Sequence, residues 1–210
     1  MDRNGSKAVL YQNLAIEPTV PRDGSGKQLF TYDQSLARLR EAGYERHLRP
    51  AEAFGLLVGS FEMTLNGLTR TVAEDMLSSY GEWLSLAMER KGYTLVCHFD
   101  PQGLEWNGST YVKTADWKST EQREFSIAGK PSQKWIDLNQ FDDNLVVALY
   151  GNSWKDLPQE MKTGYRRAQM YLPSEGVLWP VARGYFYGSV FSVNSYACNG
   201  GVSRGGSPST

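Results

Sequence analysis

Cysteine, long apolar runs and an excess of charge of either sign are all scarce in this sequence of 210 residues. Two cysteines, Cys97 and Cys198, are too few for a disulfide scaffold and lack the spacing of a structural zinc site. The sequence does not decide whether these two form a disulfide bond with each other. The 22 basic and 23 acidic residues leave no basic excess to neutralise phosphates, so we expect no nucleic-acid partner. The longest apolar runs, such as Leu145 to Tyr150, are far shorter than the roughly 18 residues that a membrane span needs. We therefore expect no membrane span.

The residues after Met1 also lack the apolar run of a secretory signal, so we expect a protein made without export. The sequence does not decide whether the protein is located on a virion or at a cell surface. Aromatic residues, by contrast, are plentiful: 8 Phe, 12 Tyr and 6 Trp supply enough apolar surface for a packed core. The length predicts a single domain over residues 1–210.

Helical spacing predominates in residues 31–92. Asp33 is positioned to cap a helix that carries Leu36 and Leu39 and ends at Gly43. Pro50 suits the first turn of a second helix. A third helix is expected over residues 71–91, because Thr71-Val-Ala-Glu74 reads as a capping box. Its apolar positions then follow helical spacing up to Gly92: Val72, Met76, Tyr80, Trp83, Leu84, Ala87 and Met88.

After Gly92 the apolar period falls to two, which is typical of strands. Asn107-Gly108 predicts a hairpin between residues 104–106 and 110–112, and the residues 100–103 predict a turn before it. Short helices are expected over 143–150 and near 157–162. The remaining strands are expected near residues 8–14, 93–99, 123–127, 134–136, 169–172, 177–182 and 190–193. Helices first and strands later predict an α+β fold with a helical N-terminal half (31–92) and a β-rich C-terminal half (93–210).

The sequence has no phosphate-binding loop, no His-Glu-x-x-His and no Gly-x-Ser-x-Gly. His98 and Asp100 share one strand face and give part of a metal site, but no third ligand is evident, so we expect no metal and no cofactor. Cys97 points to the opposite face and is expected in the core. The alternative function is a hydrolase or nuclease that uses Asp100, Glu105 and His98 around the 93–113 hairpin.

The composition changes at Gly176. From there to Thr210 the chain has no Asp, Glu or Lys. The stretch from Gly184 to Ser203 also lacks Gln, Met and Trp and consists mostly of Gly, Ser, Tyr, Asn, Val and Phe. Two interpretations fit: a glycine-rich tail of strands and turns, or a recognition surface, because Tyr, Ser, Gly and Asn are the residues that predominate in antibody contact loops.

Three sequence stretches carry a resemblance to a known family: Leu178-Trp-Pro-Val-Ala-Arg-Gly184, Tyr185-Phe-Tyr-Gly-Ser-Val-Phe-Ser-Val-Asn194 and Asn199-Gly-Gly-Val-Ser-Arg-Gly205. Together they resemble the C-terminal variable region of the C-type-lectin-fold proteins that diversity-generating retroelements diversify. Those retroelements randomise adenines in Asn-type codons, and codons of that kind ending in a pyrimidine cannot encode Lys, Glu, Gln, Met or Trp. The segment departs from the family pattern in lacking a second Gly after Arg183-Gly184 and in having Val-Ser-Arg where Gly-Phe-Arg is usual.

The resemblance implies a C-type-lectin-like arrangement of the C-terminal half, with a hypervariable display segment over residues 181–204. It also implies non-covalent recognition of a protein or cell-surface ligand, by a virus or its host, and no enzymatic activity. The identity of the ligand and the oligomeric state stay open. The expected ligand-binding residues are Tyr185, Tyr187, Ser189, Ser192, Asn194, Tyr196 and Asn199.

Overall fold

The computed structural model describes residues 9–11, 14–16, 30–59, 62–65, 68–71, 82–127, 135–137, 143–156, 159, 169–185, 191–195, 202–203 and 205–208. The helices described are α1 (Tyr32–Glu41), α2 (Pro50–Val58), α4 (Asp143–Tyr150) and α5 (Ser153–Asp156). The first strands are β1 (Val9–Tyr11), β2 (Leu14–Ile16), β3 (Arg46–His47), β4 (Glu62–Leu65) and β5 (Leu68–Thr71). The middle of the chain forms β6 (Glu82–Lys91), β7 (Thr94–Phe99), β8 (Gln102–Trp106), β9 (Tyr111–Lys118), β10 (Glu121–Ser126) and β11 (Trp135–Asp137). The last strands are β12 (Gln169–Tyr171), β13 (Leu178–Tyr185), β14 (Phe191–Ser195), β15 (Val202–Ser203) and β16 (Gly205–Pro208).

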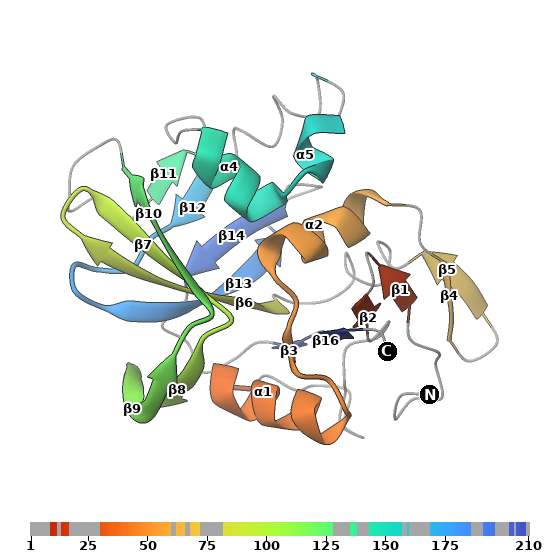
Figure 1. Cartoon of the computed structure of the whole chain (residues 1–210), viewed down its shortest axis with the longest axis horizontal. Coiled ribbons are helices and arrows are strands. Elements are labelled where there is room, and N and C mark those ends of the chain that lie inside the picture. The colour runs from red at the N-terminus through yellow and green to blue at the C-terminus, as the bar shows by residue number, and fades with distance from the viewer. Residues whose placement is uncertain are drawn as a thin grey trace.

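A six-stranded sheet forms the centre of the structure, with the strand order β10-β7-β6-β13-β14 and β15 added beside β6. Neighbours along this path pair antiparallel, whereas β15 runs parallel to β6. Helices α2 and α4 lie over one side of the sheet, and α1 lies with the β8–β9 hairpin on the other side (Figure 1). The sheet is therefore covered on both faces.

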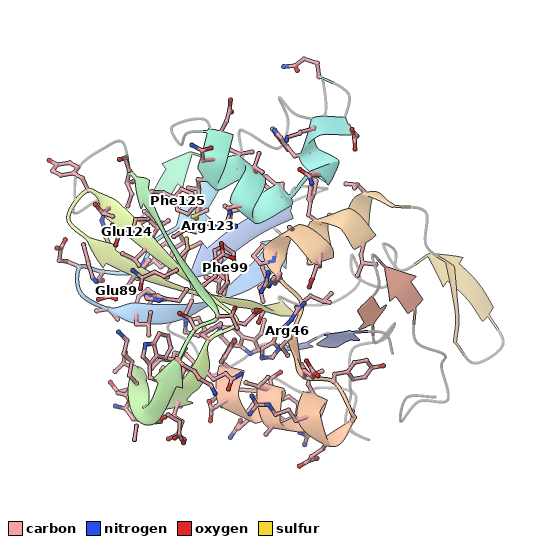
Figure 2. The ribbon with its side chains drawn as sticks, in the orientation of Figure 1. Arg46, Glu89, Phe99, Arg123, Glu124 and Phe125 are labelled. Carbon is pink, nitrogen blue, oxygen red and sulfur yellow. The ribbon has the colours of Figure 1, made fainter. Side chains whose placement is uncertain are left out.

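Strand β6 is buried on both faces, because its alternating residues enter two separate cores. Leu84, Leu86 and Met88 pack with Phe54 of α2 and Leu145 of α4 in the larger core. This core also takes Phe125 from β10, which Figure 2 shows beneath α4. Because the period of a strand is two, the intervening residues of β6 face the opposite side.

The smaller core lies under α1 and the β8–β9 hairpin. Trp83 and Ala87 of β6 pack there with Tyr32 of α1, Leu104 of β8 and Tyr111 of β9. Trp83 is 1% exposed, and its indole nitrogen donates a hydrogen bond of 2.9 Å to the carbonyl of Phe30. This core holds the hairpin and the helix against the sheet.

The predicted helix over 71–91 is wrong. Residues 82–91 form strand β6, and β5 ends at Thr71; the residues between them lie outside the described part. The physical reason is the burial of β6 on both faces. Trp83, Leu84, Ala87 and Met88 occupy both sides of a strand, and the same spacing of apolar residues also fits one face of a helix.

The expected division into a helical N-terminal half and a β-rich C-terminal half is also wrong. Strands are spread along the chain, with β1 to β6 beginning before residue 92, and helix α4 lies in the second half. The C-type-lectin-like α+β arrangement built on that division is withdrawn with it. The division failed because a helix was assigned to residues that form the central strand of the sheet.

Several local predictions are confirmed. Helix α2 begins with Pro50 in its first turn, α4 covers 143–150, and the Asn107-Gly108 hairpin joins β8 to β9. Helix α1 is capped by Thr31 rather than by Asp33, in a capping box with Gln34. Residues 153–156 form the short helix α5, and of the helix expected near 157–162 the structure describes Gln159 alone, which is helical.

Candidate functional site

The C-terminal segment enters both larger sheets of the structure. Backbone pairing joins β13 to β14 from Val181↔Ser195 to Tyr185↔Phe191. Further on, β15 pairs with the start of β6, and β16 pairs with β2 and β3. The described parts of residues 178–208 are therefore strands of the fold, which both interpretations of this segment allow.

The structure places three of the seven predicted binding residues. Tyr185 ends β13, and Ser192 and Asn194 lie in β14, where Ser192 pairs with Gly184 and Asn194 with Ala182. Nothing is described of their side chains. The other four, Tyr187, Ser189, Tyr196 and Asn199, lie outside the described residues.

The strand that leads into this segment is firmly anchored. Leu178 is 6% exposed in the smaller core, and Val181 is fully buried in the larger one. Trp179, between them, is only half-buried and stacks on Tyr171 at 6.2 Å between ring centroids. Before β13, the amide of Gly92 donates a hydrogen bond of 2.8 Å to Oε1 of Glu175.

Asp100, one of the residues of the alternative hydrolase site, is held in a structural ion pair. Its carboxylate accepts hydrogen bonds from the guanidinium of Arg49 and, at 2.8 Å, from the hydroxyl of Thr120. Nε of Arg46, labelled in Figure 2, lies 3.7 Å from Oδ1. Burial alone would raise the pKa of Asp100, but the hydrogen bonds from Arg49 and Thr120 and the charge of Arg46 outweigh it and lower the pKa.

His98 belongs to a different group of side chains. Its Nε2 lies 3.7 Å from Oε2 of Glu89, and its ring meets Trp117 edge-on at 5.4 Å. Lys113 also lies 3.8 Å from Glu89. Burial, together with the charge of Lys113, lowers the pKa of His98. Cys97 is buried in the larger core, as expected, and its thiol is free.

The three residues of the alternative site are therefore not brought together. Asp100 is bound to two arginines and His98 lies against Glu89 and Trp117, whereas Glu105 lines a separate groove. Within the described part of the chain, no group of three or more His, Cys, Asp or Glu side chains could hold a metal ion.

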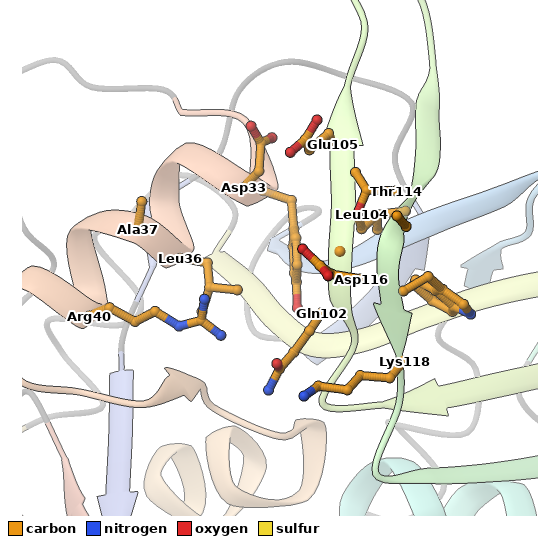
Figure 3. Close-up of a pocket in the computed structure, with 14 residues that line it drawn as sticks. Asp33, Leu36, Ala37, Arg40, Gln102, Leu104, Glu105, Thr114, Asp116 and Lys118 are labelled. Carbon is orange, nitrogen blue, oxygen red and sulfur yellow. The ribbon is translucent and has the colours of Figure 1, made fainter.

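The groove itself is a cavity of about 600 Å³ between helix α1 and the β8–β9 hairpin (Figure 3). Tyr32, Leu36 and Ala37 line its helix side, and Leu104 and Trp117 line its hairpin side. Its polar lining is mostly charged and includes Asp33, Arg40, Gln102, Glu105, Thr114, Asp116 and Lys118.

An irregularity in the hairpin shapes the groove. Gln102 pairs with Lys118 but Leu104 pairs with Lys113, so residues 114–117 of β9 bulge opposite Gly103 alone. Gly103 has φ 69°, and a Cβ at this position would lie 2.6 Å from the backbone of Asp116 and Trp117. Only glycine allows this approach, so the bulged wall of the groove depends on it.

Hydrogen bonds tie the helix side of the groove to the hairpin side. The amide of Tyr32 donates to the hydroxyl of Tyr111 at 3.0 Å, and the Tyr32 hydroxyl donates to the carbonyl of Pro101 at 3.4 Å. Burial and the charge of Asp100 raise the pKa of Tyr32, which stays protonated. His47 packs on Tyr32 at 4.6 Å between ring centroids. The two walls are therefore fixed relative to each other.

Comparison with known proteins gives no match: no family model fits the chain, and no curated protein and no solved structure is similar to it. None of the helices in the described residues combines the length and apolar character needed to cross a bilayer.

The groove was not predicted from the sequence. The sequence predicts Asp33 as a helix cap and Gly103 as part of a turn, and no pattern distinguishes Arg40 or Asp116. One signal was present, because an isolated glycine within a strand often marks a bulge. The meeting of residues 33–40 with residues 102–118 depends on tertiary packing, which no local pattern encodes.

Proposed function

We propose that this chain is a recognition protein that presents its C-terminal segment, residues 181–204, to a protein or cell-surface ligand and catalyses no reaction. The supporting observation is the placement of the segment's backbone. The described parts of this stretch, residues 181–185, 191–195 and 202–203, are strands of the central sheet, and they continue from the buried residue Leu178.

This arrangement suits recognition for an energetic reason. A binding segment that is ordered before it meets its ligand loses less conformational entropy on binding. Strand β13 is paired with β6 on one side and with β14 on the other, so its backbone is fixed by the scaffold. Sequence change within the segment is then compatible with a constant backbone, as diversification by a retroelement requires.

The first experiment measures tolerance to change. Tyr185, Tyr187, Ser189, Ser192, Asn194, Tyr196 and Asn199 are randomised together in the full chain with codons ending in a pyrimidine. The control library randomises an equal number of buried positions of β6, β7 and α4. We expect most clones of the first library, and few of the second, to unfold cooperatively and to resist proteolysis. Equal loss of folding in both libraries would contradict the proposal.

The second experiment measures binding. The first library is displayed and selected against hen egg-white lysozyme, a folded protein with no relation to this chain. We expect binders whose affinity is lost when the seven positions are restored to the original residues. If no binders emerge from a library that folds, the segment is not a recognition surface.

The third experiment concerns the origin of the variation. The DNA around the gene should contain a near-copy of the codons for 181–204 beside a reverse transcriptase gene, with differences confined to adenines of the copy. Differences scattered over all four bases would overturn the retroelement assignment. They would not affect the proposal of ligand recognition, which the binding experiment tests separately.

A further inference from the structure

The groove between α1 and the β8–β9 hairpin has opposite charges at its two ends. Figure 3 shows Asp33 and Glu105 close together at one end, and Arg40 and Lys118 on the opposite side of the cavity. Both walls contribute to both ends, since Asp33 and Arg40 come from the helix and Glu105 and Lys118 from the hairpin. The groove is therefore polarised along its length.

The spacing of the charges follows from the secondary structure. Asp33 and Arg40 are seven residues apart on α1, which places them on one helix face and about 10 Å apart along the axis. On β8, Gln102, which pairs with Lys118, is three residues from Glu105, again about 10 Å along the strand. A ligand that meets both ends must therefore extend over a similar length.

These side chains are not engaged with one another. Among the described residues, Asp33, Glu105, Asp116 and Lys118 form no ion pair, and Arg40 forms none either. Oδ1 of Asp33 is also buried without a hydrogen-bond partner within this part of the chain. Buried carboxylate oxygens normally accept a hydrogen bond, so this atom indicates a donor that a ligand would supply.

The charges exclude several ligand classes. Three carboxylates, from Asp33, Glu105 and Asp116, would repel a phosphorylated ligand. Arg40 and Lys118 would repel a polyamine, and an apolar ligand would leave all five charges desolvated and unpaired. A metal ion has no group of three suitable side chains in the described residues. A zwitterion with its charges well separated fits both ends.

We propose that this groove binds a short linear peptide, of three residues, through its free termini. The ammonium group would lie at Asp33 and Glu105, and the carboxylate at Arg40, whose planar guanidinium suits two-point binding of a carboxylate. An extended chain spans at most about 3.6 Å per residue, so a tripeptide matches the spacing of about 10 Å and a single amino acid does not. This inference does not depend on the function proposed for the C-terminal segment.

The test is an NMR titration of the full chain with trialanine, followed on the backbone amides of α1 and the β8–β9 hairpin. Matched titrations use N-acetyl-trialanine, trialanine amide and free alanine. We expect saturable shifts with trialanine at millimolar concentration. Removal of either terminal charge should weaken binding by about tenfold or more, because each terminus makes charge-assisted hydrogen bonds. Free alanine should also bind more weakly.

Arg40→Gln makes the test specific. Arg40 is exposed, so its substitution should leave the fold intact. It should lower the affinity for trialanine by about tenfold but leave the affinity for trialanine amide unchanged, because the amide already lacks the carboxylate that Arg40 binds. Arg123→Gln, on strand β10 outside the groove, is the control and should change neither affinity. Absence of saturable shifts in the folded wild-type chain, equal binding of free and blocked peptides, or equal effects of the two substitutions would each overturn the proposal.

Discussion

The Nε atom of Arg49 lies 3.1 Å from each carboxylate oxygen of Asp100, across 51 positions of the sequence. Asp100 is also the one non-glycine residue with a positive φ, 49°, in the described part of the chain. It closes the turn between β7 and β8, and Arg49 immediately precedes helix α2. The pair therefore links the helix to the turn from which the β8–β9 hairpin starts.

Asp100→Asn should destabilise the protein by about 2 to 3 kcal/mol, because it removes charge-assisted hydrogen bonds from a carboxylate that is 8% exposed. Asn tolerates the positive φ, so the turn itself is kept. Urea unfolding near neutral pH measures the loss. Arg123→Gln, which breaks an exposed pair with Glu121, serves as the control and should cost less than about 1 kcal/mol. Equal losses would show that the Asp100 pair contributes no more than a surface pair.

Trp83→Ala should cost about 3 to 5 kcal/mol, because the side chain is buried in the smaller core and its removal leaves a cavity. Trp83→Phe should cost less than Trp83→Ala, since it keeps a ring and loses mainly the hydrogen bond to Phe30. Thermal unfolding of both variants decides the point. An unchanged melting temperature for Trp83→Ala would contradict the packing described for β6.

Local signals in the sequence predicted many elements correctly. Pro50 marked the start of α2, and Asn107-Gly108 marked the hairpin, because both residue types restrict the backbone directly. Strand β6 was missed for the opposite reason. Its apolar pattern reflects two cores that meet it from opposite sides, and the sequence of one segment does not reveal how many faces are buried.

The groove could not be predicted from the sequence for a similar reason. Asp33 and Arg40 share a helix face, which their spacing of seven residues does indicate. Their position opposite Glu105 and Lys118 depends on the bulge at Gly103 and on the hydrogen bond from Tyr32 to Tyr111. The bulge lies within one hairpin, but the hydrogen bond joins segments 79 positions apart, and the periodicity of neither segment predicts that meeting.

His47 should make the stability of the protein depend on pH. Burial, with a smaller contribution from the charge of Arg40, lowers its pKa from 6.5 to about 3 in the folded state. On acidification the unfolded chain protonates His47 before the folded chain does. The free energy of unfolding is therefore highest above the unfolded pKa of 6.5 and falls as the pH drops from there towards 3. The loss attributable to His47 at about pH 5 should be about 2 kcal/mol.

Urea unfolding of the wild-type chain and of His47→Gln at mildly alkaline and at acidic pH isolates this effect. Gln cannot take up the proton, so the variant should lose less stability on acidification than the wild type does. His98→Gln is the control: the pKa of His98 is lowered too, but Glu89, whose Oε2 lies 3.7 Å from Nε2 of His98, opposes that shift, so this variant should follow the wild type more closely. Parallel pH profiles for the wild type and His47→Gln would show that His47 is not the source.

Gly103 and Gly92 form a matched pair that separates backbone strain from steric clash. Both have a positive φ, 69° and 60°, but a Cβ at Gly92 meets no atom within 4 Å, whereas one at Gly103 lies 2.6 Å from the backbone of Asp116. Gly92→Ala should therefore cost only the strain of a left-handed residue, about 1 to 2 kcal/mol. Gly103→Ala carries that strain and must also push the bulge of β9 away, so its loss in urea unfolding should be clearly larger. The amide resonances of residues 114–117 should shift only in Gly103→Ala, because the displaced backbone belongs to the wall of the groove. Equal losses for the two variants, with no shift at 114–117, would mean that Gly103 is needed for its backbone angle alone and that the close contact with β9 does not shape the groove.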